Sequence, residues 1–185
     1  MNLFEFLMIL LSLIVGLGLA EILSGFANHL KRNGFRELSW PHAVITLTVF
    51  LGLLQHFWEA WGLRFVGVWT FPMMLMMLGS PICLYLIAHV LFPERGESAN
   101  LGDYYLDRAP LVWPLAGLTV IIGTAFRPIA FGDPLWISDN ASGVLILAVC
   151  AILTVAKSRM LHNVLVPLVF AAVLLDVLTF SHSIG

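Results

Sequence analysis

The chain has 185 residues, of which 60% are apolar and only 11% carry a formal charge. A soluble domain carries about 25% charged residues, and a soluble chain of this length cannot hide so much apolar surface. The composition therefore excludes a water-soluble protein and predicts an all-α, polytopic helical bundle in a lipid bilayer, because helices satisfy their own backbone hydrogen bonds there. The net charge of −2 provides no basic surface for nucleic acid.

Six segments are apolar enough to cross a bilayer, which takes roughly 17–25 residues. They belong to a single transmembrane domain over residues 1–185, with predicted spans at 3–28, 41–63, 67–92, 110–127, 141–157 and 161–180. The connections are short except for residues 93–110, which have the composition of an acidic, soluble loop. The N-terminus lacks the basic region and cleavage site of a signal peptide, so we expect the first span to be retained.

Basic residues are distributed unequally between the two sides of these spans. Of the nine lysines and arginines, only Arg64 and Arg127 fall in the connections after the second and fourth spans. The positive-inside rule then places the other connections in the cytoplasm and both termini outside it. We therefore predict a multi-pass protein of the inner (plasma) membrane.

The six tryptophans all fall near predicted span ends, which predicts an aromatic belt at the membrane interfaces. Two of them begin similar segments, WPHAVIT at Trp40 and WPLAGLT at Trp113. An internal repeat of the kind found in transporters would explain this pattern. An interfacial tryptophan followed by proline in the first helical turn explains it equally well. Either interpretation places Trp113 at the beginning of a helix.

The first span combines an acidic residue with small residues that recur every four positions. The small residues form a stripe that allows another helix to approach closely, and they are Ser12, Gly16, Ala20 and Ser24. Glu21 lies next to this stripe, so helical geometry predicts that it faces protein. A carboxylate inside the bilayer costs at least about 2.5 kcal/mol. Two interpretations stay open, a hydrogen bond to Thr46, Tyr85 or Lys157, and a station on a proton or ion path.

A second polar set lies in the outer half of the predicted bundle. Gln55, His56 and Glu59 share one face of the second span, and Asp176 of the sixth span has a similar depth. The set predicts an outward-facing pocket in which Glu59 or Asp176 pairs with Arg64 or Arg127. The candidate residues of a polar pathway are therefore Glu21, Gln55, His56, Glu59 and Asp176.

No cofactor is predicted outright, but two remain open. One set of side chains in the outer half has ligand types that suit a metal such as zinc or iron, namely His56, Glu59, Asp176 and His182. His29 and His89 have similar depth on the cytoplasmic side and are candidate axial ligands of haem b. Walker A, GxSxG and GxGxxG motifs are absent, which argues against soluble-enzyme chemistry. Cys83 and Cys150 are predicted to be inert packing thiols.

The first half of the chain, through Pro93, resembles a family of small bacterial inner-membrane proteins of about six spans. The matching segments are FEF…SLIVGLGLAEILSG, WPH, FWEAW and WTFPMMLMML…LYLIAHVLFP. That family has no established activity, so the resemblance implies a fold and a location but no functional residues. From the residues themselves, the leading hypothesis is a transporter or channel-like protein for a small ion or solute, with proton coupling left open. The alternatives are a structural or accessory subunit of a larger membrane complex, and a membrane metal- or haem-binding protein. The partners expected besides lipid are further copies of the chain, in a homo-oligomer, or a larger membrane complex.

Overall fold

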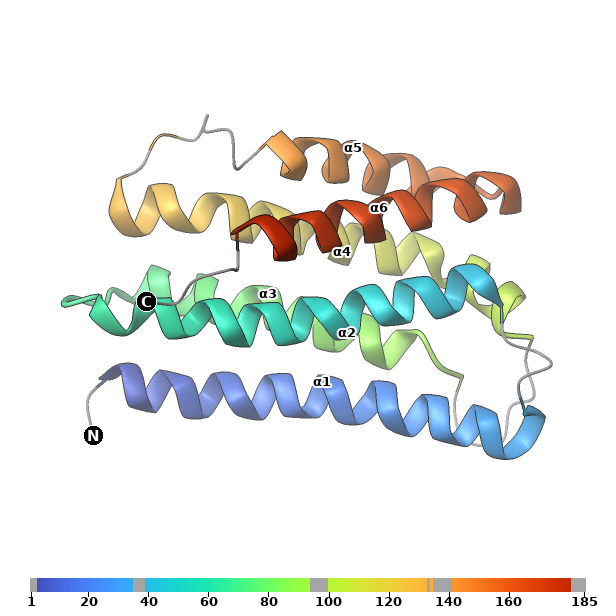
Figure 1. Ribbon diagram of the computed structural model, residues 1–185, viewed down its shortest axis with the longest axis horizontal. Helices are drawn as coiled ribbons and strands as arrows, with labels where there is room; N and C mark the ends of the chain where they lie inside the picture. Colours follow the sequence, from blue (N-terminus) through green and yellow to red (C-terminus); the bar gives the residue numbers. More distant parts are fainter. Residues whose placement is uncertain (1–2, 35–38, 94–99, 133, 135–140, 181–185) are drawn as a thin grey trace.

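The computed structural model describes residues 3–34, 39–93, 100–132, 134 and 141–180 as a bundle of helices (Figure 1). No strand occurs among these residues, which confirms the predicted all-α class. One short 3-10 helix, η1, lies between the second and third α-helices. The elements in chain order are α1 (Leu3–Asn33), α2 (Trp40–Ala60), η1 (Trp61–Phe65), α3 (Phe71–Val90), α4 (Leu101–Phe131), α5 (Ala141–Val155) and α6 (Arg159–Phe180).

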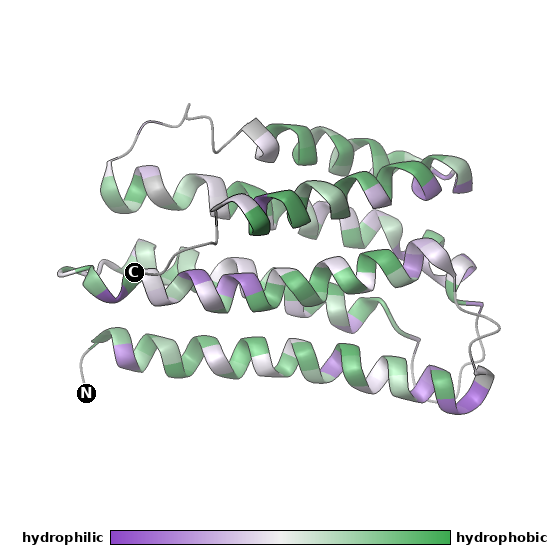
Figure 2. Cartoon of the chain, in the orientation of Figure 1, coloured by the Kyte–Doolittle hydropathy of each residue, from purple (hydrophilic) through white to green (hydrophobic). Residues whose placement is uncertain are grey.

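Five helices of the described ranges are long and apolar enough to cross a membrane, and α5 is a shorter apolar helix. Apolar residues cover most of the length of the helices, while strongly polar residues are most frequent near one end of the bundle, with a smaller group on α2 toward the other end (Figure 2). Many large apolar side chains are exposed on the outside, among them Leu13, Leu17 and Leu175. This pattern is compatible with an integral membrane protein, because lipid rather than water then contacts that surface.

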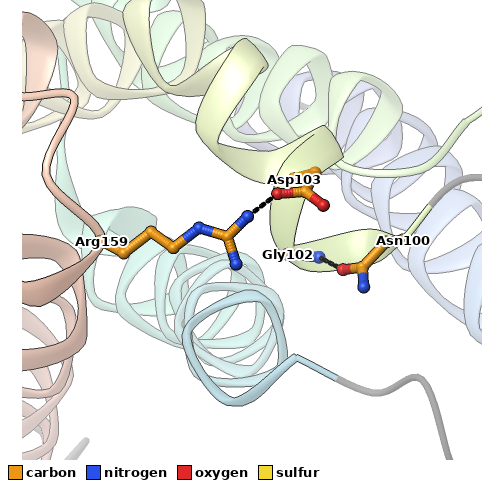
Figure 3. A network of polar contacts seen from close by, with 4 residues as sticks. All are labelled: Asn100, Gly102, Asp103 and Arg159. Atoms are coloured by element: carbon orange, nitrogen blue, oxygen red, sulfur yellow. Dashed lines mark hydrogen bonds and ion pairs between the residues drawn. The ribbon is translucent and has the colours of Figure 1, made fainter.

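The fourth helix begins well before its predicted span. The side-chain oxygen of Asn100 accepts a hydrogen bond of 2.9 Å from the backbone N–H of Gly102, which caps the helix. Asp103 lies in the first turn, where a carboxylate is favoured by the helix dipole, and pairs with Arg159 at the start of α6 (Figure 3). Residues 101–109, expected in a soluble loop, are therefore helical because local capping and charge outweigh their polar composition.

The helices alternate in direction, so that α1 begins and α6 ends at the same end of the bundle (Figure 1). We call this the N-terminal end. The opposite end, which we call the basic end, carries the basic residues Lys31, Arg32, Arg108, Lys157 and Arg159. It also contains the starts of α2, α4 and α6.

Five helices form a closed ring, and the sixth lies outside it. In sequence around the ring, α2 contacts α3, α3 contacts α4, α4 contacts α5, α5 contacts α6, and α6 returns to α2. Helix α1 packs mainly on α2 and α3. The interior of the ring is densely filled near the basic end, where Leu91, Leu101, Val112, Leu153 and Val166 are completely buried.

Among the described residues, the small-residue stripe of α1 faces away from the other helices of this chain. Its four residues, Ser12, Gly16, Ala20 and Ser24, are all exposed. The apolar residues Leu7, Leu11, Val15 and Ile22 are buried instead, and their helical register turns the stripe to the opposite face. The close contacts of α1 come from Gly18 beside Leu53 and Gly25 beside Phe92.

Candidate functional site

A cavity of about 710 Å³ lies inside the ring of helices. Its lining comes from α2, η1, α3, α4, α5 and α6, and none of the described lining residues belongs to α1. On α4 the lining runs from Trp113 to Phe131, which is roughly 27 Å at the rise of an α-helix. The cavity is therefore elongated along the bundle, and its volume lies in the range of roughly 300–1,000 Å³ that small-molecule sites occupy.

A pair of carboxylates lies in the part of the cavity nearest the N-terminal end. The side-chain nitrogen of Gln55 donates a hydrogen bond of 2.8 Å to Oε1 of Glu59, one turn further along α2. The same nitrogen donates a hydrogen bond of 3.2 Å to Oδ2 of Asp176 on α6. Because both partners are carboxylates, which only accept, the amide must turn its nitrogen toward them. The structure thus brings together three side chains that the sequence could place only at similar depth.

The other members of the predicted outer set are placed differently. His56 lines the cavity beside this pair, and its Nδ1 atom is buried without a hydrogen-bond partner. Arg64 donates a hydrogen bond of 3.0 Å to the carbonyl oxygen of Trp61 and lies over the ring of Phe65. His182 and the side chain of Arg127 lie outside the described residues.

The proposed metal ligands do not form a metal centre in the part of the chain that the structure describes. No group of three or more histidine, cysteine or acidic side chains lies close enough there to hold an ion. His56, Glu59 and Asp176 all line the cavity, but sharing one cavity does not bring them to ligand geometry.

The middle of the cavity offers fewer free hydroxyl donors than its threonine and serine residues suggest. Thr48, Ser80 and Thr119 line it, but each hydroxyl donates to a backbone carbonyl oxygen. The distances are 2.8 Å from Thr48 to Val44, 3.3 Å from Ser80 to Thr119 and 3.0 Å from Thr119 to Leu115. Hydroxyl groups that donate to helix carbonyls have no proton left for a solute. The surrounding wall consists mainly of aliphatic, methionine and aromatic side chains.

Trp113 lines the end of the cavity nearest the basic end and is completely buried. Its prediction as an interfacial residue is therefore wrong. Trp40 starts α2 and is 63% exposed, whereas Trp113 lies inside α4. The early start of α4 causes the difference, because it moves Trp113 from the membrane interface into the interior of the bundle.

On the side of Trp113 toward the basic end, a chain of three hydrogen bonds crosses the packed part of the bundle. The indole nitrogen of Trp113 donates to the hydroxyl of Tyr105 at 3.1 Å. That hydroxyl lies 2.8 Å from Nδ1 of His162, and Nε2 of His162 lies 2.9 Å from the carbonyl oxygen of Ala156. Trp113, Tyr105 and His162 are all buried. We call these three residues and the Ala156 carbonyl the closure network.

The direction of every hydrogen bond in the closure network follows from its two ends. An indole N–H can only donate and a carbonyl can only accept. Nε2 of His162 is therefore a donor, and with a neutral imidazole the Tyr105 hydroxyl donates to Nδ1 while it accepts from Trp113. Every polar group of the network is then satisfied with His162 neutral, which is the condition under which buried polar networks rigidify a fold.

Glu21 lies outside the cavity. Its Oε1 is 3.4 Å from Nδ1 of His89, and the two side chains are 40% and 64% exposed. His89 also stacks on Tyr85, while the hydroxyl of Thr46, a predicted partner of Glu21, donates to the carbonyl of His42 in its own helix. The contact partner of Glu21 is thus on α3, because its position on α1 faces the flank next to that helix.

Of the two candidate haem ligands, His89 is therefore in contact with Glu21 on the outer surface of α1 and α3. His29 is buried on α1, and its Nε2 atom has no hydrogen-bond partner.

No family model matches this chain, and no curated protein or solved structure matches it significantly. The resemblance to small bacterial inner-membrane proteins therefore stays an expectation.

Sequence reasoning missed Tyr105 and His162. Tyr105 fell in the expected loop, and His162 was one isolated histidine near the start of the last span. The available signal was the spacing of Tyr105 and Trp113, which are eight residues apart and lie on one face if a single helix contains both.

Proposed function

We propose that this protein is a membrane transporter or channel-like protein for a small solute that occupies the cavity inside the ring of helices. The observation that carries the proposal is the elongated cavity of about 710 Å³, with acidic side chains toward one end and a packed, hydrogen-bonded floor at the other. Acidic residues within membrane helices mark substrate or ion pathways by default, since they are expensive to keep in lipid.

The asymmetry of the packing supports a cavity that opens toward one side only. Its lining reaches η1, with Gly62 and Leu63, at the N-terminal end. Toward the basic end it stops at Trp113, beyond which the closure network and completely buried residues fill the ring. We propose that the basic end faces the cytoplasm of an inner (plasma) membrane, as the positive-inside rule favours. The cavity then opens outward, and passage of a solute requires the closure network to separate.

Gly123 and Gly16 provide a matched pair of variants to test this proposal. A Cβ atom added at either glycine meets no other atom within 4 Å, so a substitution at either position starts without a clash. Gly123 lines the cavity, whereas Gly16 lies on the exposed face of α1. Gly123→Phe should therefore narrow the cavity. Gly16→Phe makes the same glycine-to-phenylalanine change within a helix and should leave the cavity unchanged.

The assay is solute flux into liposomes that contain the purified protein. The solutes are protons, potassium, ethylammonium, acetate and glycerol, followed with an entrapped pH dye or by light scattering. We expect at least one of them to cross faster than in protein-free liposomes, Gly123→Phe to slow it at least tenfold, and Gly16→Phe to stay within twofold of the wild type. Absence of protein-dependent flux for all five solutes, or equal flux in both variants, would contradict the proposal.

A further inference from the structure

We infer that the ligand of the cavity is an amphiphilic amine: a protonated amino group bound at the carboxylates of Glu59 and Asp176, and an apolar body extending toward Trp113. This inference rests on the proposed function for its biological meaning, but it concerns ligand chemistry and is tested by binding rather than by flux.

The head of such a ligand matches the hydrogen-bonding capacity of the acidic part of the cavity. Gln55 holds the carboxylates of Glu59 and Asp176 on one nitrogen, so their acceptor oxygens are near each other. Each carboxylate has about four acceptor positions, and the bond from Gln55 occupies one on each. An ammonium group has three donors and no acceptor. It can therefore bond to both carboxylates at once, whatever further partners they have.

The charge of the lining favours a cation over an anion or a neutral solute. Among the described lining residues, the side chains with a full charge are Glu59 and Asp176, and both are negative. In a site walled by apolar side chains, opposite charges attract more strongly than in water.

The walls favour an organic cation over an inorganic one. A metal ion needs several ligands that converge within about 2.6 Å, and the described residues contain no suitable group of three or more. The hydroxyls in the middle of the cavity donate to backbone carbonyls, and Trp113 lines the far end. An elongated, apolar chamber of this kind gains affinity from an apolar body, at about fourfold for each buried CH₂ group.

The test is direct binding of n-octylammonium by calorimetry, with the purified full-length protein in non-ionic maltoside micelles and with protein-free micelles subtracted. Octanol and octanoate serve as ligands of equal chain length without the positive charge. We expect octylammonium to bind at least tenfold more tightly than either. Shortening the chain to butylammonium should weaken binding, about fourfold per CH₂ removed while the chain still lies in the cavity.

The matched variants replace carboxyl groups by amides of the same shape. Glu59→Gln combined with Asp176→Asn should weaken octylammonium binding about tenfold or more, since a charged partner is lost from a desolvated site. Glu21→Gln makes the same chemical change outside the cavity and should alter binding less than twofold. If the double variant does not fold, the comparison of the three ligands on the wild-type protein remains a complete test.

Cys150 reports where the ligand binds. This thiol lines the cavity near Trp113, whereas Cys83 is not among the lining residues. In a Cys83→Ser protein, octylammonium should slow the alkylation of Cys150 by a small uncharged maleimide at least tenfold, and octanoate should not. Addition of phosphatidylethanolamine to the micelles distinguishes the source, because an aminolipid ligand displaces octylammonium and a soluble amine ligand is unaffected by the lipid.

Equal affinities for octylammonium, octanol and octanoate would overturn the inference, as would binding that leaves Cys150 fully reactive. Binding of octylammonium without flux of any solute would keep the ligand class and refute transport. Flux of acetate or glycerol that Gly123→Phe blocks, without octylammonium binding, would keep transport and refute the ligand class.

Discussion

The closure network predicts a specific cost for the loss of one hydroxyl group. Tyr105→Phe preserves the ring, its volume and its edge-on contact with His162, but it removes the hydroxyl oxygen that takes part in two hydrogen bonds of the closure network. The indole N–H of Trp113 and Nδ1 of His162 then lose their partners in a buried environment. Both groups must be left unsatisfied or find new partners through a local rearrangement.

The expected loss of stability is about 1–3 kcal/mol. An unsatisfied buried polar group costs about 1–3 kcal/mol, but hydrogen bonds between membrane helices average only about 0.6 kcal/mol because the unfolded chain also finds partners in the membrane. Two bonds at the membrane average give about 1.2 kcal/mol and two fully unsatisfied groups about 2–6 kcal/mol, and local rearrangement in the membrane keeps the total near the lower end of this range. The measurement is reversible unfolding in mixed micelles with rising dodecyl sulfate, followed by circular dichroism.

Tyr85→Phe provides the control, because the Tyr85 ring stacks on His89 outside the closure network. A second check is the combination of Tyr105→Phe with Trp113→Phe. Once the indole N–H is gone, the missing hydroxyl leaves one unsatisfied group fewer, so the combined loss should be smaller than the sum of the single losses. The reasoning is refuted if Tyr105→Phe and Tyr85→Phe agree within about 0.5 kcal/mol, the ordinary range of surface substitutions.

Four further outcomes follow from the packing and charge of the helices, and the same unfolding assay checks each. A Cβ atom on Gly25 would overlap the ring of Phe92, so Gly25→Ala should destabilise the protein by about 1–3 kcal/mol. Gly16→Ala, where the Cβ meets nothing, should be neutral or stabilising by up to about 1 kcal/mol, and equal effects at the two glycines would contradict the packing of α1. Glu21→Gln should cost less than about 1 kcal/mol, because the contact it weakens is largely exposed. Asp103→Asn should likewise cost less than about 1 kcal/mol and lose that effect in high salt, since its ion pair is exposed.

The sequence was sufficient for the class of the fold and for most of its helices. Apolar runs of the required length identify membrane helices because lipid permits few other structures. The principal error was the start of α4, where the polar composition of residues 101–109 outweighed the capping signal of Asn100. The misplacement of Trp113 at an interface followed directly from that error.

The sequence predicted the position of the candidate-site residues along the membrane normal, but not the direction in which their side chains point. Counting residues along a helix gives position along the membrane normal at about 1.5 Å per residue, and this placed Gln55, Glu59 and Asp176 at one level. It does not give the rotation of one helix relative to another. For the same reason Glu21, correctly located along α1, was expected to face the interior of the protein and instead lies on the flank beside His89.

The closure of the ring by α6 has a consequence for how the protein is made. Helices α1, α2 and α3 pack on one another and follow directly in the chain, so they can associate while the rest is still being synthesised. The hydrogen bond that joins α2 to α6, from Gln55 to Asp176, spans 121 positions of sequence. Until α6 has entered the membrane, the acidic residue of α2 faces lipid or an incomplete bundle, which is costly. Insertion of α6 therefore completes the cavity and encloses its carboxylates within protein. A chain truncated before α6 should be recognised as defective by membrane quality control.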